Sequence, residues 1–153
     1  MPLTLRVPAF TQPGKPREFM NEVVVPFLER NLEYLIYELE QITPEGVTGN
    51  LRGGYTSEIR GYSSNENFRG IITNDIKYIK YVDEGTAPHW APIENLRGWA
   101  ELKGINPYAL QAHIAVHGTK PQHIFDQVRA NAFPAIMVDW QRTIGALWQK
   151  YKR

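Results

Sequence analysis

A regular stripe of apolar residues near the start of the chain constrains the fold more than any other feature. Its four leucines stand four, three and four residues apart, and apolar residues continue the stripe upstream as far as Phe19. This is the period of an amphipathic α-helix, predicted here from Pro16 to Ile42 and typical of a domain core, with contact to a second subunit as the alternative. Pro26 is expected to kink the helix or divide it into two. The stripe consists of Phe19, Val23, Phe27, Leu28, Leu32, Leu35 and Leu39.

After this helix the periodicity changes to two. Polar and apolar residues alternate in residues 55–60 and 68–73, and the polar cluster from Ser63 to Asn67 lies between the two runs. This pattern predicts a β-hairpin with a loop of about five residues, preceded by one helical turn within 47–54. A lone hairpin is only marginally stable in water, so it is expected to pack on the long helix or join a larger sheet. The run 76–82 fits a helix and a strand equally well.

Residues 81–104 form the stretch around which the rest of the chain is organised. Its Gly-Thr pair at 85–86 favours a turn, and the prolines at 88 and 92 bias the residues before them toward an extended conformation. Residues 85–92 are therefore predicted to form a stiff loop. Trp90, in the middle of the loop, either fills the protein's own core or protrudes as an anchor for a partner. A short amphipathic helix over 93–103 is predicted to follow, with Gly104 at its end.

The last third of the chain is predicted to be helical. Asn106 suits an N-cap position in front of a helix that ends at Gly118. Pro121 is expected to open a further helix through Arg129, and Pro134 to break or restart it. Apolar residues from 136 to 151 then recur at helical spacing to the C-terminus.

Together these segments predict an α+β fold. Its small antiparallel sheet, with a central β-hairpin, is flanked by a long N-terminal helix, short middle helices and a long C-terminal helix. Residues 1–14, with three prolines and one glycine, are expected to form an extended N-terminal arm. This arm is expected either to fray or to form a single edge strand if another strand accepts it, and such arms often reach onto a neighbouring subunit. Residues 15–153 are expected to form a single domain.

The composition argues against several classes of function. The net charge is +1, so no general electrostatic attraction to nucleic acid or anionic membrane is expected. The chain has no cysteine, which excludes disulfides and Cys-ligated metals and is typical of proteins that fold in a reducing cytoplasm. The N-terminus does not resemble a signal peptide, and no apolar run approaches the roughly 20 residues that span a bilayer.

The strongest candidate for metal chemistry is the pair His113 and His117, which stand four apart on one predicted helix. Histidines at this spacing can bind zinc. However, Ile114 stands where the H-E-x-x-H metalloprotease motif requires glutamate. A third ligand would have to come from His89, His123 or a carboxylate, so neither a metal nor a cofactor is expected.

Other catalytic arrangements are equally weak. Asp83 and Glu84 are adjacent, so their side chains point in different directions and do not form an acid–base pair, although Glu84 could cap the amides of the loop beside it. The serines at 63 and 64 lack the context of a nucleophile elbow, and no phosphate loop or dinucleotide fingerprint is present. We therefore expect that the chain is not an enzyme.

Four short motifs, in this order, resemble the neck or tail-completion proteins of long-tailed bacteriophages, which form the minor head–tail connection. They are YIKYVDEGT at 78–86, PHWAP at 88–92, LRGW at 96–99 and GTKP at 118–121, the last followed by Phe125. The resemblance covers residues 15–150. Asp83 and Ile124 stand where the family more often has Glu and Pro, which leaves the contacts of these loops open.

The resemblance implies an α+β subunit of a cyclic, six-fold ring at the head–tail junction of the virion, assembled in the host cytoplasm. DNA would pass through the lumen without specific binding, and other neck and tail proteins would be partners, with no membrane involved. The N-terminal arm and the loop at 85–92 would then contact neighbouring subunits. The candidate contact residues are Glu84, Gly85, Thr86, Pro88, His89, Trp90, Pro92, Thr119 and Pro121.

Three alternatives remain at this point. A tail terminator or a head-closure stopper of the same junction would have a similar size and ring geometry. A small metal-dependent hydrolase would use His113 and His117 and would bind stoichiometric zinc. A monomeric nucleic-acid-binding domain would show an affinity for DNA that depends steeply on salt.

Overall fold

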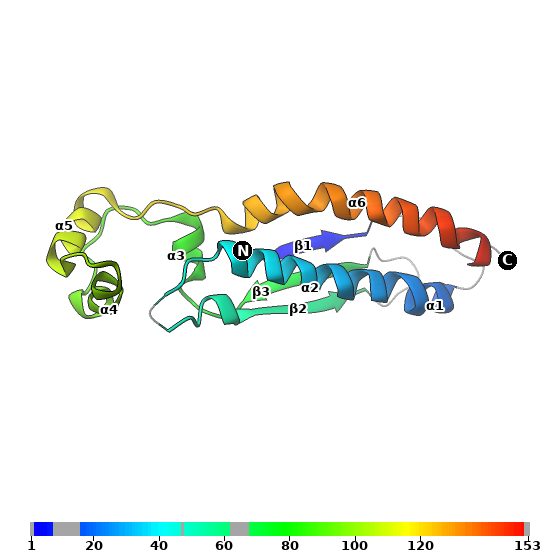
Figure 1. Cartoon of the computed structure of the whole chain (residues 1–153), viewed down its shortest axis with the longest axis horizontal. Coiled ribbons are helices and arrows are strands. Elements are labelled where there is room, and N and C mark those ends of the chain that lie inside the picture. Colours follow the sequence, from blue (N-terminus) through cyan, green and yellow to red (C-terminus); the bar gives the residue numbers. More distant parts are fainter. Residues whose placement is uncertain (1, 8–15, 47, 62–67, 152–153) are drawn as a thin grey trace.

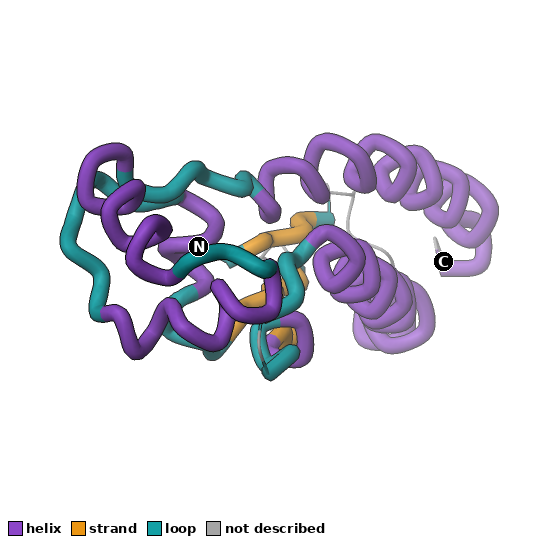
Figure 2. Tube along the Cα trace, turned by 60° about the vertical axis from the view of Figure 1, so that its left-hand side comes forward, coloured by secondary structure: helices purple, strands orange, loops and turns teal. Residues whose placement is uncertain are grey.

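The computed structural model describes residues 2–7, 16–46, 48–61 and 68–151 and has two unequal parts (Figure 1). The larger part, the body, consists of a small sheet and two long helices. The smaller part, the lobe (residues 86–119), is a pair of short helices that projects from one end of the body (Figure 2). The strands are β1 (Leu3–Arg6), β2 (Tyr55–Arg60) and β3 (Arg69–Asn74). The helices are α1 (Pro16–Phe19), α2 (Val25–Ile42), α3 (Ile79–Glu84), α4 (Ile93–Lys103), α5 (Pro107–His117) and α6 (Ile124–Tyr151).

The sheet is antiparallel in the order β1-β3-β2. Leu3 pairs with Ile72 and Leu5 with Gly70, so these side chains share one face of the sheet, and both leucines are fully buried. Helix α2 packs on β2 and β3, and α6 packs on β1 and on α2. The structure therefore has the predicted α+β architecture, with a central hairpin between a long N-terminal and a long C-terminal helix.

Strand β1 belongs to the segment that the sequence predicts as an N-terminal arm. The predicted extended conformation is present, and the strand that accepts it is the chain's own β3. Leu3, Leu5 and Val7 are buried in the common core, so this part of the arm does not reach a neighbouring subunit. The rest of the arm, 8–14, and the predicted loop from Ser63 to Asn67 lie outside the described residues.

The N-terminal helix follows its predicted range and contains a π-helical segment, Met20–Val24, directly before α2. Proline at position 26 has no amide hydrogen to donate to the preceding turn. The wider π turn accommodates this missing hydrogen bond and lets the helix continue. Four leucines of the predicted stripe, together with Phe19 and Phe27, are buried.

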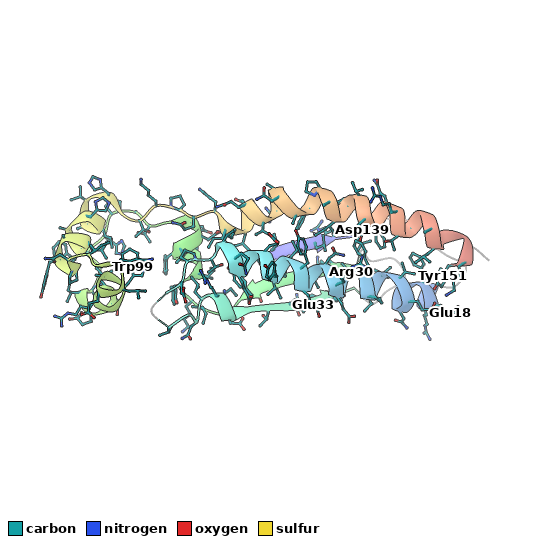
Figure 3. The ribbon with its side chains drawn as sticks, viewed as in Figure 1. Glu18, Arg30, Glu33, Trp99, Asp139 and Tyr151 are labelled. Atoms are coloured by element: carbon teal, nitrogen blue, oxygen red, sulfur yellow. The ribbon has the colours of Figure 1, made fainter. Side chains whose placement is uncertain are left out.

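Gly70 determines how closely α2 approaches the sheet. A Cβ atom at this position would lie 2.6 Å from Leu32 Cδ2, so only glycine leaves room for the leucine above β3. On its other side α2 meets α6, where Phe27 packs on Trp140 with ring centroids 4.8 Å apart. An ion pair of 2.7 Å between Arg30 and Asp139 lies at the surface of the same contact (Figure 3).

The C-terminal helix differs from its prediction. It begins at Ile124 and not at Pro121, and it continues through Pro134 to Tyr151 without a break. Pro134 is exposed, so solvent can satisfy the carbonyl group that it leaves without a partner. The packing of Ile136 and Trp140 in the core holds the helix on the far side of the proline. In the described residues no helix combines the length and hydrophobicity needed to cross a membrane.

Local signals decide the remaining elements. The run 76–82, which fits helix and strand equally in the sequence, becomes helical from Ile79, where α3 (Ile79–Glu84) begins. A 3-10 turn at Arg52–Gly54 is the short helical turn predicted before the hairpin. The side chain of Asn106 accepts hydrogen bonds from two amides of α5, and Gly104 ends α4 in the left-handed conformation. The predicted boundaries of α4 and α5 are therefore confirmed.

Candidate docking surface

The lobe is joined to the body by two extended segments that pair with each other. The amide of Thr86 donates to the carbonyl of Thr119, and the amide of Thr119 donates to the carbonyl of Thr86, both at 3.2 Å. Their hydroxyl groups lie 3.0 Å apart. We call this pairing, with the glycines 85 and 118 that precede the two threonines, the clasp. The clasp closes the lobe at its base.

Both glycines of the clasp have a backbone conformation that other residues avoid. Gly85 has φ 71° and ψ −176°, and Gly118 has φ 69° and ψ −157°. A Cβ atom on Gly85 would lie 2.5 Å from the carbonyl oxygen of Thr119, and one on Gly118 would lie 2.0 Å from that of Thr86. Each glycine thus leaves room for the backbone of the opposite segment of the clasp. The sequence signal for this pairing is the order Gly-Thr-x-Pro, which occurs at 85–88 and again at 118–121.

Asp83 connects the clasp to the body. Its backbone carbonyl accepts the amide of His123 at 3.0 Å, and its carboxylate accepts the amide of Phe125 at 3.3 Å in the first turn of α6. A carboxylate in this position also interacts favourably with the positive end of the helix dipole. The sequence offered Glu84 as a possible cap for the amides of the adjacent loop; in the structure Glu84 is exposed and forms a 3.9 Å ion pair with Lys80. The buried Asp83 therefore has the anchoring role that the sequence analysis missed.

A buried polar cluster supports the same end of the body. The hydroxyl group of Tyr55 lies 2.6 Å from that of Thr43, which also donates to the carbonyl of Leu39 at 2.6 Å. The ring of Tyr55 packs edge-on against Phe125, with centroids 6.1 Å apart. Burial raises the pKa of Tyr55 above its ordinary value. The lobe thus projects from a rigid, packed platform.

Trp90 protrudes from the lobe. Its side chain is 71% exposed, the largest value among the exposed large hydrophobic residues of the described chain. The backbone around it is nevertheless fixed: the amide of His89 donates to the carbonyl of Ile114 at 3.3 Å, and the side chain of Gln111 donates to the carbonyl of Ala91 at 2.7 Å. The sequence left open whether Trp90 fills the core or protrudes from the surface. In the structure its side chain protrudes.

The lobe has little core of its own. Its buried apolar residues are Ala91, Ala100 and Ile114, none of which belongs to the main core cluster. Trp99, which lies in α4 (Figure 3), is only partly buried. Aromatic residues are enriched at protein interfaces and among their hot spots. The exposed large apolar residues of the lobe are Trp90, Leu102, Ile105, Tyr108 and Val116.

The other predicted contact residues lie on the same segments as Trp90 and the clasp. Pro88, His89 and Pro92 are exposed along the loop at 85–92, and Pro92 is the N-cap of α4. Thr119 and Pro121 are exposed on the returning segment. The structure thus places the predicted residues at the base of the lobe and on the loop that carries Trp90.

The two helical histidines are adjacent but isolated. His113 and His117 are exposed on α5, with ring centroids 4.7 Å apart. No group of three or more histidine, cysteine or acidic residues arranged to hold a metal ion occurs in the part of the chain that the structure describes. A metal-dependent hydrolase would need a third ligand beside His113 and His117, and the described residues do not supply one there.

Comparisons of the chain with models of protein families, with characterised proteins and with solved structures find no match. The resemblance to phage neck proteins accordingly depends on the four short motifs. In the structure three of these motifs are neighbours: residues 78–86 lead through α3 into the clasp, residues 88–92 carry Trp90, and residues 118–121 form the other half of the clasp. These three motifs form the base and loop of the lobe, and the fourth, at 96–99, lies in α4.

Proposed function

We propose that this chain is a structural subunit of a bacteriophage head–tail junction, a neck or tail-completion protein that assembles into a ring through which DNA passes. Its mechanism is docking between subunits and with other neck and tail proteins. The observation that carries the proposal is the lobe: a rigidly based helical pair that exposes Trp90 at 71% and four other large apolar side chains. An isolated soluble subunit gains nothing from this exposure, whereas a ring subunit buries it.

The motifs support this assignment over other docking proteins. All four resemble the neck family, and three of them lie at the base and loop of the lobe. The net charge of +1 suits a lumen through which DNA must move without being held. A tail terminator or a head-closure stopper would use the same geometry, and the position of the ring in the virion distinguishes these proteins.

The experiment is native mass spectrometry combined with negative-stain electron microscopy of the purified full chain, with and without zinc. We expect closed rings with six subunits and no bound metal. Trp90→Ala is expected to remain folded by circular dichroism and to lose ring assembly. Tyr81→Ala is the matched control, because Tyr81 is a similarly exposed aromatic residue, at 60%, on the body.

A chain that forms no rings alone and is absent from the head–tail junction of phage particles contradicts the proposal. A monomer that takes up one zinc ion instead supports the alternative that uses His113 and His117. In phage particles that contain the protein, labelled antibody is expected at the head–tail junction and not along the tail.

A further inference from the structure

The sheet has one face covered by helices and one open face. Helix α2 covers the face that carries Leu5 and Gly70, because a Cβ atom on Gly70 would meet Leu32 of that helix. Side chains alternate between the two faces of a strand, so the residues next to these along the strands lie on the other face. None of the residues of this open face is buried. They are Thr4, Arg6, Thr56, Glu58, Arg60, Arg69, Ile71 and Thr73.

Three arginines stand in register across one end of the open face. Arg6 of β1 pairs with Arg69 of β3, and Arg69 pairs in turn with Arg60 of β2. The amide of Val7 donates to the carbonyl of Phe68, so Arg6 and Arg69 form a non-hydrogen-bonded pair with Cα atoms about 4.5 Å apart. Arg69 and Arg60 then form a hydrogen-bonded pair, with Cα atoms about 5.5 Å apart. We call these three residues the arginine row.

Two of the three charges in the arginine row are uncompensated. Arg60 forms a 2.5 Å ion pair with Glu58, which is the one acidic residue on the open face of the described strands. The side chains of Arg6 and Arg69 have no hydrogen-bond or ion-pair partner among the described residues. The segments 8–15 and 62–67, outside the described residues, contain one lysine and one glutamate and so add no net charge. This end of the sheet therefore carries an excess of positive charge.

The arginine row is unfavourable for the sheet that carries it. Like charges directly opposite each other destabilise a strand pair, and here two strand pairs place three arginines side by side. A bound anion would remove this repulsion. The guanidinium group presents a planar fork of N–H donors, which matches the geometry of a phosphate. The row therefore suits a ligand that presents several phosphates close together.

The rest of the open face favours a nucleic-acid backbone over a second protein. Ile71 is the only large apolar residue on this face of the described strands, and it is partly buried. Protein interfaces have an apolar core with aromatic anchors, whereas DNA-binding surfaces are more polar and positively charged. The hydroxyl groups of Thr56 and Thr73, which lie 3.1 Å apart, are of the kind that contact phosphate oxygens.

We infer that the arginine row contacts the phosphate backbone of double-stranded DNA, and that the open face of the sheet faces the lumen of the ring. The orientation toward the lumen rests on the proposed function. Two uncompensated arginines in each subunit attract DNA without regard to its sequence and let it slide. The row lies at the end of the sheet away from the lobe (Figure 1), so subunit docking and DNA contact use separate surfaces.

Fluorescence anisotropy of a labelled DNA duplex, titrated with the full chain at several salt concentrations, tests the phosphate contact. The logarithm of the affinity is expected to fall linearly with the logarithm of the salt concentration. Arg6→Gln with Arg69→Gln is expected to make this slope shallower by about 2 for each subunit that contacts the duplex, because each phosphate contact contributes about one. Arg6→Lys with Arg69→Lys keeps the charge and is expected to retain most of the slope.

The matched control removes the same charge elsewhere. Arg129→Gln with Arg142→Gln changes two exposed arginines of α6, which packs on the other face of the sheet, and is expected to leave the slope nearly unchanged. Circular dichroism of each variant verifies the fold. Native mass spectrometry of each variant shows whether rings still form.

The position of the DNA in the ring is tested with a cleavage reagent. The chain has no cysteine, so a single introduced thiol can be labelled with an iron chelate that generates hydroxyl radicals. Rings labelled at Thr56→Cys, on the open face, are expected to cut bound DNA. Rings labelled at Val138→Cys, an exposed position of α6, are expected to cut it much less.

The outcomes separate this inference from the proposed function. Rings that bind no DNA at low salt, or whose slope is the same in the Arg6→Gln, Arg69→Gln variant, overturn the inference and leave the ring proposal standing. Loss of rings in that variant with an unchanged affinity for DNA identifies the row as a protein contact and also overturns it. A monomer whose salt-dependent affinity requires the two arginines supports the phosphate contact and contradicts the ring. Rings whose slope falls in the variant, and whose DNA is cut from position 56, support both.

Discussion

Replacing Gly118 by alanine tests whether the clasp holds the lobe to the body. Alanine at this φ and ψ is strained by about 1–3 kcal/mol. The new Cβ atom would also lie 2.0 Å from the carbonyl oxygen of Thr86, whereas real Cβ atoms essentially never approach within 3.0 Å. The obstacle is backbone, so a side-chain rotation cannot relieve it and the clasp must open.

The expected magnitude follows from the hydrogen bonds that open with the clasp. Two backbone hydrogen bonds join Thr86 and Thr119, and each contributes about 0.5–1.5 kcal/mol. Together with the strain, the total destabilisation is about 2–6 kcal/mol. Gly104→Ala is the matched control: Gly104 also has positive φ, 66°, but a Cβ atom there meets nothing within 4 Å. Its cost is expected to be about 1 kcal/mol.

Amide hydrogen exchange is the appropriate assay, because it separates opening of the lobe from global unfolding. In Gly118→Ala the amides of Thr86 and Thr119 are expected to lose their protection, while core amides of α2 such as that of Leu32 keep most of theirs. Denaturant unfolding gives the global change in free energy. If Gly118→Ala exchanges and unfolds like Gly104→Ala, the clasp does not hold the lobe and the reasoning is wrong.

Three further predictions concern the body. Burial raises the pKa of Tyr55, so the stability that its neutral hydroxyl group contributes is complete below the ordinary tyrosine pKa of about 10 and is lost as the pH rises above that value. Tyr55→Phe is expected to cost about 1 kcal/mol near neutral pH, because the hydrogen bond to Thr43 is lost, and to flatten the alkaline part of a stability–pH curve. Trp140→Ala removes the partner of Phe27 and is expected to cost about 3–5 kcal/mol in denaturant unfolding, and a cost below about 1 kcal/mol contradicts the packing of α2 on α6. Asp83→Ala is expected to cost about 1–2 kcal/mol and Asp83→Asn less, because asparagine still accepts the amide at the start of α6; equal costs would assign the effect to charge alone.

The sequence predicted well those parts of the fold that are determined by residues close to one another along the chain. The ends of α4 and α5 follow from a glycine in the left-handed conformation and from the amide caps supplied by Asn106. The leucine stripe of α2 and the alternation of β2 and β3 follow from the periodicity of side chains about a helix and a strand. Each of these signals lies within a few residues of the structure that it predicts.

The errors arose where distant residues decide the outcome. Pro134 was expected to break a helix, but the packing of Ile136 and Trp140 against the core carries α6 past it. The sequence considered only Glu84, as a possible cap for the loop beside it, and gave no sign that the carboxylate of Asp83 accepts an amide of α6, some forty residues later. The pairing of residues 86 and 119 was not foreseen, although the repeated Gly-Thr-x-Pro order was its signal.

The sequence by itself determined the N-terminal helix, the hairpin and the ends of α4 and α5, since capping, turn conformation and amphipathic periodicity are properties of short segments. Only the tertiary structure decided that the first strand pairs within its own sheet, that the clasp closes the lobe, and that Trp90 points away from the core. These features depend on which surfaces meet when the elements pack. A tryptophan that could fill a core is exposed here because its loop is hydrogen-bonded to α5 on both sides of it, which holds the side chain outward.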